Sequence, residues 1–179
     1  MTEKMKKYFS ILIFLLITQL IPAQSGAIEA FFDKYSEKEG FTSIYISGKM
    51  LNMLGGMSKE PGKQDNILLR LKSIRILSED DSLSRGKVNF YSELSRALDL
   101  SEYEELMVVR EGPDVTKFLI RQTGDVITEL IMITGGSEGN SLISIKGDIN
   151  LKELSELSKT IGIEELEHLE KADNRNIRK

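Results

Sequence analysis

The sequence predicts a single α+β domain in which an antiparallel four-strand meander is extended by two further strands, with helices packed on the sheet. The main observation is a series of four apolar runs of strand length, separated by the short links GPD, TGD and GGSEGN. Short links that contain glycine favour hairpins, so consecutive runs are expected to pair. The chain of 179 residues is 40% hydrophobic and 29% charged, which is typical of one domain with a real core. The four runs lie at 103–111, 115–122, 126–134 and 141–149.

The first 24 residues have the layout of a secretory signal peptide. Three lysines precede the apolar run ILIFLLI at 11–17, and a polar break then leads into IPAQS. We expect cleavage near Ala23, Gln24 and Ser25. A retained membrane anchor is the alternative, but the apolar run is shorter than the roughly 20 residues of a spanning helix. The sequence therefore predicts export to the periplasm or beyond the cell, with no stable membrane span after cleavage.

Processing would leave a mildly acidic chain, with one domain at 25–172 and a frayed tail at 173–179. Loss of residues 1–24 removes three lysines and one glutamate, so the formal charge changes from 24 − 28 = −4 to 21 − 27 = −6. This acidity argues against a nucleic-acid binder. The chain contains no cysteine, which excludes disulfides and lipid attachment at a cleavage-site cysteine.

The segment before the meander alternates helices and strands. Apolar residues from Ala27 recur at helical spacing and stop at Gly40, which predicts a first helix. The run FTSIYIS at 41–47 is apolar on both faces, so we expect a strand in the interior of the sheet. The segment KMLNMLGGM at 49–57 is expected to be helical as far as its glycine pair.

Three more elements lead into the meander, and helices follow it. We expect a short helix at 67–71, a strand at 73–79, and a helix of about 14 residues that ends near Leu100. After the meander, Asn150 can cap a helix with Glu153 as its capping-box partner. The expected inner residues are Val88, Tyr91, Leu94, Ala97 and Leu98 in the first long helix, Leu151, Leu154, Leu157 and Ile161 in the second, and Ile163, Leu166 and Leu169 beyond Gly162.

The glycine-rich stretch ITGGSEGN at 133–140 raises the possibility of a phosphate-binding loop. Such a loop requires a lysine, a serine or threonine and a helix start after its last glycine. Here Gly139 is followed by Asn140, Ser141 and another apolar run of strand length. We therefore predict a hairpin turn, and no cofactor.

No catalytic or metal-binding constellation is visible in the sequence. The only histidine, His168, lies among glutamates and is expected on the surface of a helix, and there is no GxSxG motif for a serine hydrolase. The acidic group Glu79, Asp80 and Asp81 lacks the alternation and the glycine of a calcium loop. We therefore predict no catalytic, cofactor-binding or metal-binding residue.

Several charged residues interrupt the predicted strands. Glu129 lies within VITELIMIT, either as an outward residue of a half-exposed strand, which we favour, or as a buried carboxylate with a role. Arg75 would form an ion pair with it if the two were neighbours. Arg75, Lys117 and Arg121 are expected on a wet face.

Methionines are the other unusual feature. Those at 50, 53, 57 and 107 could soften a binding groove, although core filling is the interpretation that we favour.

Five stretches in this order behind a signal peptide resemble domain-of-unknown-function family 4252, over about residues 26–170. The resemblance implies a single extracytoplasmic domain, with typical members in Bacteroidota, and it carries over no catalytic residue. Some members lie beside sigma-factor genes, which implies envelope regulation. The stretches are FFDKYSEKEGFTSIYIS, LKSIRILSED, YEELMVVREG, ITELIMITGG and ISIKGDINLKELSEL.

Our leading hypothesis is therefore a noncatalytic binding or regulatory module of the cell envelope, with a protein as possible partner. A carrier of a small apolar ligand is the second hypothesis, motivated by the methionines and by strands that are apolar on both faces. A carboxylate-based hydrolase that uses Glu129 is the third.

Overall fold

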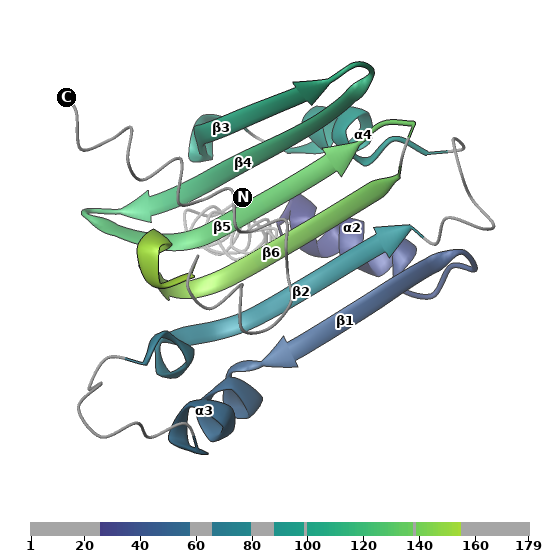
Figure 1. Ribbon diagram of the computed structural model, residues 1–179. Coiled ribbons are helices and arrows are strands. Elements are labelled where there is room, and N and C mark those ends of the chain that lie inside the picture. The colour runs from purple at the N-terminus through teal and green to yellow at the C-terminus, as the bar shows by residue number, and fades with distance from the viewer. Residues whose placement is uncertain (1–25, 58–65, 80–87, 99, 138, 155–179) are drawn as a thin grey trace, which may run out of the picture.

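The computed structural model describes residues 26–57, 66–79, 88–98, 100–137 and 139–154. Its strands form one six-stranded antiparallel sheet in the order β1-β2-β6-β5-β4-β3 (Figure 1). The last four strands form the predicted meander, and the first two extend it beside β6, so the α+β class is confirmed. The strands are β1 (Phe41–Ser47), β2 (Leu71–Glu79), β3 (Glu104–Glu111), β4 (Asp114–Thr123), β5 (Val126–Gly135) and β6 (Asn140–Ile149).

Helices pack on both faces of the sheet. Two of them, α2 and α4, lie behind the sheet in Figure 1, and a helix that begins at Leu151 packs on the opposite face. The helix α4 is shorter than the expected length of about 14 residues, and its start is capped by Asn89, whose side chain accepts the Ser92 N–H. The helices are α2 (Ala27–Tyr35), α3 (Gly48–Met57) and α4 (Phe90–Ala97), with 3₁₀ turns η1 (Ile67–Leu69) and η2 (Leu100–Glu102).

An aromatic cluster joins α2 and α4 to one face of the sheet. The Phe31 and Phe90 rings meet edge to face with their centroids 4.9 Å apart, and Phe41 stacks on Phe90 at 5.8 Å. Such ring pairs add to the stabilisation from apolar burial. The sheet side of this core consists of Leu77, Leu119, Ile131, Ile133 and Leu142.

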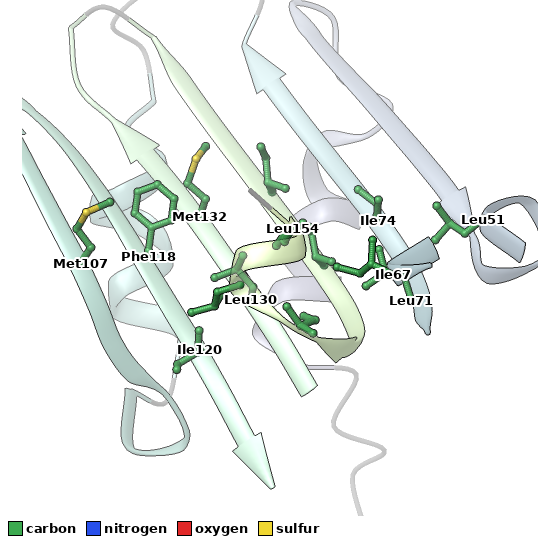
Figure 2. Close-up of a cluster of buried hydrophobic side chains, with 14 residues drawn as sticks. Leu51, Ile67, Leu71, Ile74, Met107, Phe118, Ile120, Leu130, Met132 and Leu154 are labelled. Carbon is green, nitrogen blue, oxygen red and sulfur yellow. The ribbon is translucent and has the colours of Figure 1, made fainter. Parts of the chain in front are cut away.

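The opposite face of the sheet carries the second core (Figure 2). The Asn150 side chain caps the helix that closes this core by accepting the N–H groups of Lys152 and Glu153 at 3.0 and 3.3 Å. The Glu153 side chain does not complete a capping box but forms an ion pair with Arg70. This core includes Leu51, Ile67, Leu71, Ile74, Met107, Phe118, Ile120, Leu130, Met132, Ile143, Ile145, Leu151 and Leu154.

The glycine-rich segment is a hairpin turn, as predicted. Gly135 pairs with Asn140 at the end of the antiparallel β5–β6 ladder. A Cβ atom at Gly135 would lie 2.6 Å from the Tyr91 nitrogen, so this glycine lets α4 approach the sheet. The buried Asn140 side chain accepts the Phe90 N–H at 2.7 Å and donates to the Val88 carbonyl at 3.0 Å. The loop therefore docks the start of α4.

The prediction of an interior position for the strand at 41–47 is wrong. β1 is an edge strand whose only neighbour in the described sheet is β2. Ile44 and Tyr45, on opposite faces of β1, are 45% and 61% exposed. An apolar pattern on both faces indicates that a strand can be covered on both sides, but it does not reveal how many strands lie beside it.

Several predictions concern parts of the chain outside the described residues. They are the cleavage region at Ala23, Gln24 and Ser25, the acidic residues Asp80 and Asp81, and the helical positions Leu157, Ile161, Gly162, Ile163, Leu166, His168 and Leu169.

Two glycine-to-alanine substitutions, one at Gly147 and one at Gly56 as its control, test the close packing at the start of β2. Gly147 has a φ of 149°, and an added Cβ would lie 2.6 Å from the Arg70 carbonyl oxygen, whereas nothing lies within 4 Å of a Cβ at Gly56. We expect Gly147→Ala to lower the free energy of unfolding by about 1–3 kcal/mol. Gly56→Ala, within α3, should raise it by up to about 1 kcal/mol. Urea unfolding followed by circular dichroism measures both, and equal stability of the two variants would contradict the packing.

Candidate functional site

A row of charged residues crosses the sheet on the face that carries α2 and α4. In the strand register, Lys146 of β6 lies opposite Glu129 of β5, and Glu129 lies opposite Arg121 of β4. Along each strand these residues alternate with residues of the opposite core, and they share their face with Leu119, Ile131 and Leu142. Tertiary pairing thus assembles three charges that are far apart in the sequence.

Glu129 is the centre of this cluster and is only 1% exposed. Its carboxylate forms an ion pair with Arg121, and Lys146 Nζ lies 3.6 Å from Glu129 Oε1. The Tyr103 hydroxyl donates to Oε2 at 3.1 Å, and the Ser144 hydroxyl donates to Oε1 at 3.3 Å. The outward position that we favoured for Glu129 is therefore wrong, because β5 is a central strand with both faces covered.

The contacts of Glu129 favour a structural role over a catalytic one. A general base needs an oxygen that can reach the proton of a substrate. Here two cations and two hydroxyl groups already surround the two oxygens. Burial and the negative charge of Glu129 raise the pKa of Tyr103, so its hydroxyl stays protonated and continues to donate.

The other two cations for which a wet face was predicted, Arg75 and Lys117, do not lie on one. Lys117 forms an ion pair with Glu105 at 2.7 Å, and its Nζ lies 5.5 Å from the centre of the Tyr91 ring of α4. Arg75 lies opposite Ser144, one row away from Glu129, and its guanidinium is 5.5 Å from the centre of the Phe32 ring. Arg75 is therefore not an ion-pair partner of Glu129, whose cationic partners are Arg121 and Lys146.

Metal ligands do not gather in the described parts of the chain, where no three acidic or histidine side chains are close enough to hold an ion. The Glu79 carboxylate accepts a hydrogen bond from the side-chain amide of Asn140, the residue that contacts the start of α4. None of the helices in the same parts of the chain is long and apolar enough to cross a bilayer.

An exposed apolar stripe on α3 is the second unusual feature. Met50, Met53 and Met57 are 48%, 58% and 82% exposed, so core filling is the wrong interpretation for these three, although Met107 is buried in the core. With Leu54 they follow the spacing i, i+3, i+4 and i+7, which places them on one side of the helix. We refer to Met50, Met53, Leu54 and Met57 as the α3 stripe.

The α3 stripe belongs to a predominantly apolar helix. Leu51 and Gly55 on the other side of α3 are buried, and Lys49 is the only charged residue of the helix. Leu69 of η1, also exposed, packs against α3 beside Gly55 and widens the apolar area.

Comparison with known proteins places the chain in a family. The family model described as Domain of unknown function (DUF4252) matches residues 35–157. The chain belongs to this family. No curated protein and no solved structure matches the chain. The match spans the whole sheet of this DUF4252 domain, together with the α3 stripe and the Glu129 cluster.

The unequal burial of the ion-pair partners leads to a stability prediction for the DUF4252 domain. Arg121 and Lys146 side chains are 39% and 32% exposed and can turn toward water, whereas Glu129 cannot. We expect combined Arg121→Met and Lys146→Met changes to lower the free energy of unfolding by about 3–5 kcal/mol, because they leave a buried carboxylate unpaired. Glu129→Leu should lower it by less than half as much. If urea unfolding showed a larger loss of stability for Glu129→Leu than for the double variant, the role of the two cations as partners of a buried carboxylate would be contradicted.

A second prediction concerns the pH dependence of stability. Burial raises the pKa of Glu29, but the hydrogen bonds that its carboxylate accepts from Lys146 and from its own backbone outweigh this effect, so the pKa lies below the ordinary value of a glutamate. A lowered folded-state pKa stabilises the fold at higher pH, and this contribution is lost as the pH falls through that pKa. Glu29→Gln should therefore lower the free energy of unfolding by about 0.5–1 kcal/mol at neutral pH.

The difference between wild type and Glu29→Gln should shrink once the pH falls below about 4.5. Urea unfolding from about pH 7 to pH 3 measures it. A difference that stays constant across this range would show that the Glu29 charge is not responsible.

Proposed function

We propose that this protein is a noncatalytic binding module that acts outside the cytoplasm, and that the α3 stripe is its binding surface. The observation that carries the proposal is the exposure of three methionines and a leucine on one side of a helix with a single charge. Contiguous exposed apolar residues of this kind mark interaction sites. The signal-peptide layout of residues 1–24 supports the location.

Methionine suits this role because its unbranched side chain can adapt to differently shaped apolar partners. The partner that we infer is a protein of the cell envelope that offers an apolar helix or loop to the stripe. Lys49 in the first turn of α3 could contact a carboxylate at the rim. Nothing in this arrangement requires a reactive group.

The same observation separates this proposal from the other two hypotheses. Three of the four methionines that suggested an internal ligand lie on the surface, where they favour a partner outside the protein. The Glu129 carboxylate, on which a hydrolase would depend, is surrounded by partners within the protein. The α3 stripe is the feature whose exposure calls for a partner.

Site-specific photo-cross-linking in the cells that make the protein tests the proposal. A photoreactive amino acid at Met57 should give a discrete product with one envelope protein. The same amino acid at Val126, an apolar side chain of 41% exposure away from α3, is the matched control and should give none. Adding Met53→Lys should reduce the Met57 product about tenfold, because it places a charge in an apolar contact.

Equal products from the two positions, or only lipid adducts at Met57, would contradict the inferred protein partner. Insensitivity of the Met57 product to Met53→Lys would show that the α3 stripe is not the contact surface.

A further inference from the structure

The edge strand β1 has the sequence of an interior strand. Its seven residues, FTSIYIS, contain no charge and no proline, and its ladder with β2 runs from Phe41 to Ser47 without a bulge. Four consecutive residues, Thr42, Ser43, Ile44 and Tyr45, are exposed. Natural proteins normally protect such an edge, because its free backbone groups can pair with another strand.

The opposite edge of the same sheet is protected. β3 carries Glu104, Glu105, Arg110 and Glu111, and its register with β4 shifts between Glu105 and Met107. Charges and bulges are the devices that prevent strands from adding to an edge. The contrast indicates that one edge is closed to partners and the other is open.

We propose that β1 pairs antiparallel with β1 of a second copy of this chain, so that the two sheets join into one. Within the described sheet each copy has one open edge, so the contact uses the same strand on both sides and closes at a dimer. The strand that looked interior in the sequence would then be interior in the assembly. The proposal uses β1 and does not depend on a partner for the α3 stripe.

Charge does not oppose a second copy at this edge. The chain has a formal net charge of −4, so two copies repel each other over most of their surface, but residues 41–57 contain only one charged residue, Lys49. Pairing all seven residues places Ile44 opposite Ile44 of the partner subunit.

The area of the contact is sufficient for a modest dimer. A seven-residue antiparallel strand is about 24 Å long. Contact along this length, with side chains on both faces, buries on the order of 1,000 Å² in total, which reaches the lower range of specific interfaces. The two α3 helices follow the two antiparallel strands at opposite ends of the contact, so both α3 stripes stay available.

A charge swap at the centre of the contact tests the pairing. The full chain is expressed in exporting cells, and the purified protein is studied by light scattering across a concentration series. Wild type should have the mass of two chains. Ile44→Lys should have the mass of one, because it places two lysines opposite each other, and Ile44→Glu should behave in the same way. An equimolar mixture of the two variants should recover the mass of two chains. Val126→Lys, at another exposed apolar position, should stay dimeric.

A cysteine variant tests the register independently of the charge swap. The chain contains no cysteine, so Ile44→Cys introduces a single thiol. Cα atoms directly opposite each other in an antiparallel pair are close enough for a disulfide, so mild oxidation should link the two copies. Val126→Cys is the control and should stay unlinked under the same conditions.

A wild type with the mass of one chain at every concentration, together with an unlinked Ile44→Cys, would overturn the proposal. A dimer that persists in Ile44→Lys would overturn it as well, because the contact would lie elsewhere. Neither result would affect cross-linking through Met57, so failure of the dimer and failure of the proposed function are distinguishable.

Discussion

Burial of the central strands on both faces is the constraint on which the rest of the structure depends. β5 and β6 lie in the middle of the sheet, with α2 and α4 on one side and the helix from Leu151 on the other. A polar side chain on such a strand must find its partners within the protein. Glu129 does so through Arg121 and Lys146, and Asn140 does so by docking the first residues of α4.

This constraint also accounts for the distribution of charge. Charges on the central strands are neutralised beneath α2, where Lys146 pairs with both Glu129 and Glu29. Because these contacts join β4, β5, β6 and α2, the cluster ties one end of the sheet to its covering helix. It resembles an active site in composition, but its geometry is that of a structural link between layers.

The periphery of the sheet follows a different rule. At β3 the protein presents charges and a bulge, whereas β1 presents uncharged side chains and α3 mostly apolar ones. Both surfaces border solvent, so the difference does not arise from burial within one copy. The difference is explained if β3 faces water whereas β1 and α3 face other molecules. The proposed binding surface and the proposed dimer both depend on this explanation.

The sequence by itself determined the elements and much of the architecture. Hairpin links and apolar runs predicted the meander, helical spacing predicted α2 from Ile28 to Tyr35, and Asn150 was identified as a cap. These features depend on contacts between residues that are close in the chain, so local patterns specify them.

Only the tertiary structure decided which strands are central, where the methionines lie and what surrounds Glu129. Local pattern gives the period of a strand but not its neighbours, so β1 was expected inside and is found at the edge. The partners of Glu129 come from Arg121 and Lys146 through strand register, which a single sequence does not specify. Long-range pairing, rather than residue type, determined whether each apolar or charged side chain became core or surface.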